Sequence, residues 1–373
     1  MRKISAICIL ALLGLFSHPA TAAEPIKIAA IFAKTGIAAV QNAAYIQIIE
    51  LAVEEINNQG GVLGRPVKLI VLDNKSTPIG STLAAKEAVR LQVTAVIGSG
   101  LSSHSLAVAP ILQQEGIPMI TPVSTNPKVT RMGNYIFRVC FIDSFQGAAM
   151  AKFAYADLKT RTAVVLRNID EAYCVTLGEY FISEFKRYGG KVLLDGNYRG
   201  KAVDFSDLLK NVKMLKPDAV YIPGYTRDSG LIIKQAVSMG IKATFLGGDA
   251  WAEIFKYAGT AANGSYHSAP WHPDVQFKTS IHLKNTYYQK YKKQIINTSQ
   301  PLSYDATIVM VDAIRRANSL DKAKIRDALA QTTDFQGATG NITFDEYGDP
   351  LGKEVIILKL ENGRRVYFKA IKP

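Results

Sequence analysis

The chain has 373 residues, of which 48% are hydrophobic and 20% charged, and its formal net charge is +13. This length predicts about two domains, and the hydrophobic fraction excludes a disordered chain. Lys and Arg are spread along the chain rather than gathered in one basic stretch, so we expect no nucleic-acid partner. The general basicity can still help to attract anions.

The first residues have the layout of a secretory signal peptide. Two basic residues precede an apolar run at 4–16, and small residues offer a cleavage site between Ala22 and Ala23. A transmembrane anchor is the alternative, but the run is shorter than the roughly 17–25 residues that span a bilayer. We therefore expect residues 1–22 to be removed and the mature protein to lie in the periplasm.

From Pro25 onward, short apolar runs alternate with amphipathic segments. The short runs are continuously apolar, which is typical of parallel strands covered by helices on both faces. Regular alternation of strands and helices predicts a doubly wound α/β fold. The expected strands are residues 26–32, 67–72, 95–97, 118–121, 163–166, 219–222 and 244–246.

Helices are expected between these strands. In residues 45–58 the apolar side chains share one face, and the following Gly60-Gly61 ends the helix. A Lys-rich segment, 284–293, is expected to form a solvated helix with its three tyrosines turned inward. The other expected helices are residues 105–114, 145–158, 177–188, 205–215, 230–239, 303–318 and 322–331.

Two further patterns describe the organisation of the chain. Residues 94–121 and 218–247 each run strand, turn, helix, glycine and strand, which favours two lobes of similar architecture over the general likeness of all α/β units. Near the end, the alternating runs 354–360 and 365–371 flank an Asn-Gly turn. This pattern predicts a β-hairpin that adds an antiparallel edge to one lobe.

Sequence motifs of catalysis are missing. The turn at 98–103 nearly matches the dinucleotide fingerprint, but it ends in Ser103 instead of glycine, and no acidic residue follows about 20 residues on. No G-x-S-x-G elbow occurs, and no His or Cys lies at metal-ligand spacing. Cys140 and Cys174 are expected to be free, although they could pair if their Cα atoms come within range. We therefore expect a binding protein without cofactor or metal; an exported hydrolase or transferase is the alternative.

Polar residues follow the ends of several expected strands, where doubly wound sheets bind ligands. Hydroxyls at a helix start, with free backbone N–H groups, suit a carboxylate, and an aspartate across a cleft suits an ammonium. The alternative is that Ser102 only caps a helix and Asp249 only forms a turn. The residues at these strand ends are Ser102, Ser103, Thr125, Tyr225 and Asp249.

These residues lie in stretches that resemble the leucine/isoleucine/valine-binding family of type I periplasmic solute-binding proteins, which serve ABC transporters. The resemblance covers nearly the whole chain after the signal peptide. It implies two Rossmann-like lobes joined by three crossing segments, around a cleft that closes on its ligand. The matching stretches are AVIG at 95–98 with Ser102-Ser103, GIPMITPVST at 116–125, FR at 137–138 with Asp143 and QG at 146–147, DFS at 204–206, and AVYIPGY at 219–225.

The resemblance also implies the domain limits and the partners. One lobe would hold residues 23–141 and 272–340, and the other would hold residues 142–271 and 341–373. The expected partners are a small ligand, with an amino acid first, and an inner-membrane ABC permease, and the protein is expected to be a monomer. An amide, a urea or an aromatic acid is the alternative ligand, and a sensory receptor component is the alternative role.

Family positions map onto this sequence residue by residue. The resemblance implies that Ser102 holds the α-carboxylate, that the Val123 carbonyl and Thr125 hold the ammonium, and that Tyr173, Tyr225 and Asp249 complete the site from the second lobe. Asp249 replaces the usual glutamate, Gln41 replaces an aromatic residue, and Leu101 replaces a cysteine, so the family's usual disulfide is absent. Gln41 predicts a polar or differently shaped ligand side chain rather than a simple leucine, because a buried amide needs a partner. Further candidates for the pocket lining are Ser103 and Trp251.

Overall fold

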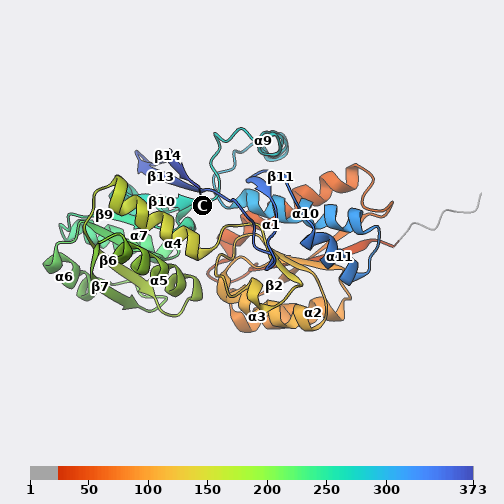
Figure 1. Cartoon of the computed structure of the whole chain (residues 1–373), viewed down its shortest axis with the longest axis horizontal. Helices are drawn as coiled ribbons and strands as arrows, with labels where there is room; N and C mark the ends of the chain where they lie inside the picture. The colour runs from red at the N-terminus through yellow and green to blue at the C-terminus, as the bar shows by residue number, and fades with distance from the viewer. Residues whose placement is uncertain (1–23, 373) are drawn as a thin grey trace, which may run out of the picture.

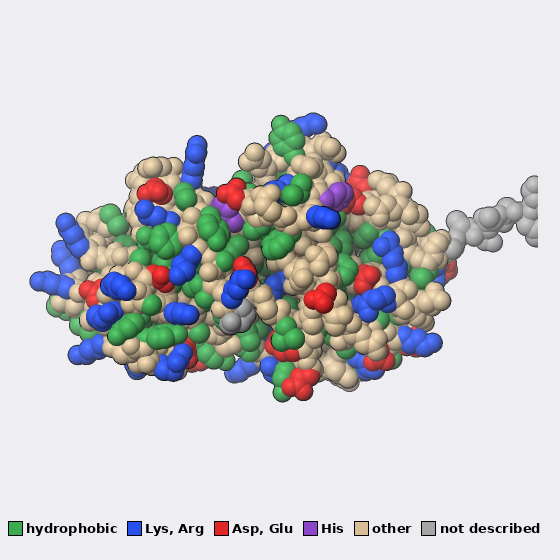
Figure 2. All heavy atoms as spheres, turned by 45° about the horizontal axis from the view of Figure 1, so that its top comes forward, with side chains coloured by type: hydrophobic (Ala, Val, Ile, Leu, Met, Phe, Trp, Pro, Cys, Tyr) green, Lys and Arg blue, Asp and Glu red, His purple; other side chains and the backbone are tan. Residues whose placement is uncertain are grey.

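The computed structural model describes residues 24–372 and places two α/β lobes side by side (Figure 1). The expected signal peptide lies outside the described residues. Within the described part of the chain, no helix combines the length and the apolar character that a membrane crossing requires. Figure 2 shows Lys and Arg side chains scattered over one face, with Asp and Glu between them.

The first lobe is built on a five-stranded parallel sheet with the order β2-β1-β3-β4-β5. In β1, Ile28, Ala30 and Phe32 pack on one face, whereas Ala29 and Ile31 pack on the other. Both faces are thus buried, which explains the continuous apolar run. The strands are β1 (Ile26–Phe32), β2 (Val67–Asp73), β3 (Ala95–Gly98), β4 (Met119–Thr121) and β5 (Ile136–Arg138).

Helices from both ends of the chain cover this sheet. In Figure 1 the N-terminal segment, in orange, and the late helices α10 and α11, in blue, share the first lobe. Side chains of α1 and α10 join one core cluster, and those of α2 and α3 join the cluster on the opposite face. The helices are α1 (Ala39–Asn58), α2 (Pro78–Arg90), α3 (Ser102–Gln114), α9 (Lys278–Tyr291), α10 (Gln300–Ala317) and α11 (Lys322–Ala330), with a 3₁₀ turn η1 (Thr130–Met132).

The second lobe holds a seven-stranded sheet with the order β14-β13-β10-β9-β8-β6-β7. Its strands are β6 (Thr162–Asn168), β7 (Lys191–Tyr198), β8 (Ala219–Ile222), β9 (Thr244–Gly247), β10 (Tyr266–Ala269), β13 (Val355–Glu361) and β14 (Arg364–Ile371). Its helices are α4 (Asp143–Lys152), α5 (Ala172–Arg187), α6 (Ser206–Leu215), α7 (Thr226–Ser238) and α8 (Phe255–Ala258). α4 continues as a π-helical turn, η2 (Phe153–Asp157), and two 3₁₀ turns, η3 (Asp249–Trp251) and η4 (Gly259–Ala262), flank α8. Together with the first lobe, this sheet confirms the predicted α/β fold of two lobes.

The predicted C-terminal hairpin is confirmed. β13 and β14 pair antiparallel, with Glu361 opposite Arg364. Between them, Asn362 and Gly363 both have positive φ, 50° and 75°. Positive φ at both central residues is the requirement of a type I′ turn, which Asn-Gly meets at low cost.

The chain crosses between the lobes after β5, after β10 and after the small hairpin of β11 (Phe335–Gly337) and β12 (Gly340–Ile342). The predicted lobe limits at 141, 271 and 340 remain predictions. After the third crossing segment begins, Phe344 still packs in the first lobe's core and Asp349 pairs with Arg138 at the end of β5.

Several local predictions need correction. α1 begins at Ala39, six residues before the expected start. α2 was not predicted, although Thr77 is its N-cap and Pro78 is its first residue, both of which are signals of a helix start. On α9, Tyr287 is buried but Tyr288 is 55% exposed, so the expectation that all three tyrosines turn inward was wrong. Cys140 and Cys174 are free and buried, and they lie in different core clusters.

Candidate ligand-binding site

A cavity between the lobes gathers most of the predicted site residues. Its free volume is only about 20 Å³, room for about one water molecule, so the two walls lie close together. The first lobe contributes Gln41, Tyr45, Gly100, Leu101, Ser102, Val123 and Ser299, and the second contributes Tyr173, Tyr225, Asp249 and Ala250.

The first-lobe wall is the N-terminus of α3. Leu101 is the N-cap residue and Ser102 is the first helical residue, so the alternative interpretation of Ser102 as the cap was wrong. The Ser102 Oγ accepts a hydrogen bond from the Asn126 backbone N–H at 3.3 Å. The first N–H groups of a helix have no intrahelical acceptor, and the helix dipole adds partial positive charge. This wall therefore suits an anionic group.

The second-lobe wall is centred on Asp249, in the turn after β9. Its side chain is buried, and its Oδ1 accepts a hydrogen bond from the Tyr173 hydroxyl at 2.8 Å. The Tyr173 ring stacks on Tyr225, with 5.4 Å between ring centroids. Burial raises the pKa of Asp249 to about 6, although the hydrogen bond from Tyr173 and the nearby Gln146 amide oppose the rise. A cation bound in the cavity would stabilise the ionised form of Asp249.

A polar wall closes another part of the cavity. The Gln41 Nε2 donates a hydrogen bond to the Tyr45 hydroxyl at 3.1 Å, which supplies a partner for the amide. Tyr45 is 1% exposed, and burial raises the pKa of its hydroxyl, so it stays neutral. Ser299, immediately before α10, also lines the cavity.

Five lining residues were not predicted: Tyr45, Gly100, Leu101, Ala250 and Ser299. Tyr45 lies one helical turn after Gln41, and Gly100 and Leu101 precede Ser102 directly, so proximity to predicted residues was the available signal. Gly100 has a steric role, because a Cβ there would lie 2.5 Å from the Asn42 Oδ1. Ser299 had no signal, because it is distant in sequence from the other lining residues.

Three predicted residues do not line the cavity. Thr125 is buried, in the turn after β4. Trp251 is buried in the second lobe's core, where its ring packs over Gly247. Residues two apart in a 3₁₀ turn point in different directions, which separates Trp251 from Asp249. Ser103 instead joins the two lobes.

Ser103 belongs to a set of hydrogen bonds beside the cavity that we call the interlobe latch. The Ser103 hydroxyl donates to the Glu171 Oε2 at 2.9 Å. The Asn126 Nδ2 donates to the Thr176 Oγ1 at 2.9 Å and to the Ala172 carbonyl at 3.2 Å. The latch ties the start of α3 and the turn after β4 to the start of α5, and therefore holds the lobes together.

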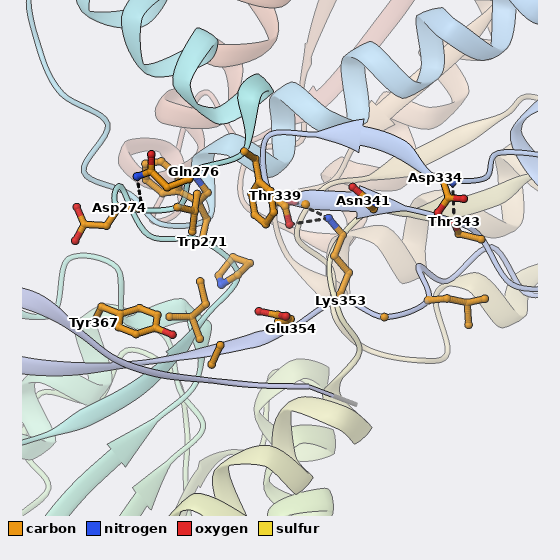
Figure 3. Close-up of a pocket in the computed structure, with 18 residues that line it drawn as sticks. Trp271, Asp274, Gln276, Asp334, Thr339, Asn341, Thr343, Lys353, Glu354 and Tyr367 are labelled. Carbon is orange, nitrogen blue, oxygen red and sulfur yellow. Dashed lines mark hydrogen bonds between the residues drawn. The ribbon is translucent and has the colours of Figure 1, made fainter.

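A larger and more open hollow, with a volume of about 900 Å³, lies on the crossing segments (Figure 3). Lys353 projects into it and its Nζ donates to the Thr339 hydroxyl at 2.7 Å. This hollow shares no lining residue with the interlobe cavity. We place the candidate site in the smaller cavity, because an anion-binding helix end and a buried carboxylate meet there. Within the described residues, no group of three or more His, Cys, Asp or Glu side chains could hold a metal ion.

Two α/β lobes that face each other across a small polar cavity define a solute-binding protein. A sequence model of the periplasmic binding protein family matches residues 25–364, and the chain belongs to that family.

Individual relatives share most of its length. A leucine-, isoleucine-, valine-, threonine- and alanine-binding protein of Pseudomonas aeruginosa is 30% identical over 90% of this chain and 89% of its own. The crystal structure of the leucine-binding protein LivK of Thermotoga maritima is 36% identical, with a TM-score of 0.88 over 93% of this chain and 99% of its own. The isoleucine complex of LivJ of Streptococcus pneumoniae is 27% identical, also with a TM-score of 0.88, over 94% of this chain and 100% of its own.

Proposed function

We propose that this protein is a periplasmic receptor that captures a free amino acid between its lobes and delivers it to an inner-membrane ABC permease. In this proposal residues 1–22 are a signal peptide, the mature protein is a monomer, and it binds its ligand without transforming it. The amino acids named for the relatives from Pseudomonas and Streptococcus support this class of ligand.

One observation carries the proposal: Asp249 is buried at one wall of the cavity and the N-terminus of α3 forms the facing wall. A free amino acid carries a carboxylate and an ammonium on one carbon, so it matches both walls. We assign the carboxylate to Ser102 and the N–H groups of α3, and the ammonium to Asp249 and the Val123 carbonyl, with Tyr173 and Tyr225 enclosing it.

The opposite end of the ligand is assigned to the polar wall. Gln41, Tyr45 and Ser299 offer an amide and two hydroxyl groups there, and a purely apolar side chain would leave their remaining hydrogen-bonding capacity unused. We therefore propose a polar amino acid such as threonine in preference to leucine.

Binding strength follows from the number of charged contacts. Charge-assisted hydrogen bonds contribute roughly 1.5–3 kcal/mol each. A handful of them can outweigh the cost of association and leave about −8 kcal/mol, a micromolar dissociation constant.

The test is titration calorimetry with a panel of amino acids and small aromatic acids. We expect amino acids to bind, threonine more tightly than leucine, and Asp249→Asn to lose about 2–4 kcal/mol, or roughly 30- to 700-fold in affinity. The control is Asp228→Asn, which changes another buried acid of the second lobe that does not line the cavity. Unchanged affinity in Asp249→Asn, or binding of aromatic acids alone, would refute the assignment. Chromatography of the recovered ligand checks that it is not chemically changed.

A further inference from the structure

A second buried acid, Asp143, lies behind the cavity. It is the first residue of α4 and is 0% exposed. Neither of its carboxylate oxygens has a hydrogen-bond partner among the described residues, and the same holds for the Thr125 Oγ1 and the Gln146 Nε2. An ionised carboxylate buried in this way is unfavourable, because nothing replaces the water that it loses.

Asp143 is connected to both sides of the proposed ammonium site. Its backbone N–H donates to the Thr125 carbonyl at 2.9 Å, in the turn that follows Val123. Gln146, one helical turn further along α4, accepts a hydrogen bond from the Asp249 backbone N–H at 2.9 Å. Asp143 therefore lies behind the proposed ammonium site and does not itself line the cavity.

The surroundings of Asp143 favour its neutral form when the site is empty. Burial raises the pKa of Asp143 to about 8; the Thr125 hydroxyl and the Arg138 guanidinium oppose this rise, and the Asp249 carboxylate adds to it. Arg138 is already paired with Asp349. The remaining titratable neighbours stay neutral, because burial raises the pKa of each: Tyr173, Tyr221, Tyr225, Cys140 and Cys174.

We propose that Asp143 carries a proton in the empty site and releases it to solvent when an ammonium group binds beside Asp249. The O–H bond of the carboxylic acid breaks, the proton passes to the buffer, and the bound ammonium stabilises the new carboxylate. This inference rests on the proposed function, and it makes ligand capture a proton-releasing reaction.

The sign of the pH dependence follows from linkage. A cation that favours the ionised carboxylate lowers the pKa of Asp143 in the complex, so affinity increases with pH until the free site has lost its proton near pH 8. One linked proton changes the dissociation constant by at most about tenfold per pH unit. We therefore expect the dissociation constant to fall by about three- to tenfold per pH unit between pH 6 and 8.

The experiment is calorimetry of the full mature protein at pH 7 in phosphate and in Tris, buffers whose heats of protonation differ. L-Threonine is the probe, and L-leucine replaces it if it binds more tightly. The dependence of the heat on the buffer gives the number of protons released, and we expect about one. In Asp143→Asn the number is expected to fall toward zero while binding persists, whereas the control Asp228→Asn is expected to release protons as the parent does.

The outcomes separate the two proposals. Failure of every amino acid to bind would overturn the proposed function. Binding with the same heat in both buffers, or full proton release by Asp143→Asn, would overturn the role of Asp143 alone. If Asp143→Asn does not fold, the buffer dependence of the parent protein and its affinity between pH 6 and 8 still decide the matter.

Discussion

The buried ion pair between Arg138 and Asp349 gives the sharpest test of the packing. Arg138 is 0% exposed, and its Nε donates to the Asp349 Oδ1 at 2.5 Å. The same guanidinium donates to the Ser124 carbonyl at 2.6 Å and to the Thr130 hydroxyl at 2.8 Å. Asp349 is the only carboxylate that pairs with Arg138 among the described residues. Its replacement therefore leaves a buried cation without a counter-charge.

We expect Asp349→Asn to destabilise the protein by about 3–5 kcal/mol, the usual cost of removing one partner from a buried pair. Asparagine keeps the shape of the side chain and can still accept the hydrogen bond from Thr130, so the lower part of this range applies. With a urea dependence of about 3 kcal/mol per molar, the unfolding midpoint falls by about 1 M.

The assay is equilibrium unfolding in urea, followed by circular dichroism and by tryptophan fluorescence. The matched control is Asp207→Asn, which breaks an exposed pair with Lys210 on the surface of α6, and the midpoint is expected to stay close to that of the parent. An Asp349→Asn midpoint that coincides with the control would refute the reasoning, because the pair would then be replaceable by water or by local rearrangement.

Three further predictions concern the cavity, the latch and the crossing segments. A Cβ on Gly248 would lie 2.2 Å from the Tyr173 hydroxyl, so Gly248→Ala is expected to weaken ligand binding by about ten- to hundredfold in calorimetry; an unchanged affinity would contradict this steric role. Asn126→Ala removes the latch contact with Thr176. Ligand dissociation is expected to become about 5- to 30-fold faster in stopped-flow measurements. An unaltered dissociation rate would show that the latch does not hold the lobes closed. Burial lowers the pKa of Lys353 to about 8, so stability is expected to rise as pH increases from about 8 toward the ordinary lysine value near 10.4. In Lys353→Met, this increase in stability with pH should be smaller. If the urea midpoints of the parent and of Lys353→Met change in parallel from pH 7.5 to 10, the prediction is contradicted.

Much of the fold could be predicted because both faces of each central strand are buried. β1 and β8 have the bounds that their apolar runs indicated, and the Asn-Gly turn located the final hairpin. Helix starts were less accurate. α1 extends into a segment with an exposed Ile37 before it and an exposed Val40 within it, so hydrophobic periodicity could not reveal its first turns.

Part of the candidate site was predictable from strand ends, and the family resemblance added Gln41 and Tyr173, which lie on helices α1 and α5. Ser102, Val123 and Asp249 follow strands whose carboxyl ends meet in the cleft, and these residues line the cavity. Ser299 lines the same cavity because α10 packs on the first lobe. No local sequence pattern indicates this packing. Asp143 was noted only as part of a matching stretch. Its isolation from hydrogen-bond partners is a property of the packed interior.

The three crossings also set the order in which the protein can mature. The sheet of the first lobe is complete at Arg138, but α10, which packs on one of its faces, begins only at Gln300. The second lobe in turn receives its two antiparallel strands from the last residues of the chain. A fragment that stops after β10 would leave both lobes unfinished, one with a bare apolar face and the other with an open sheet edge. Neither lobe can therefore be excised as a self-sufficient unit, and a nascent chain can complete both lobes only after β14 has been synthesised.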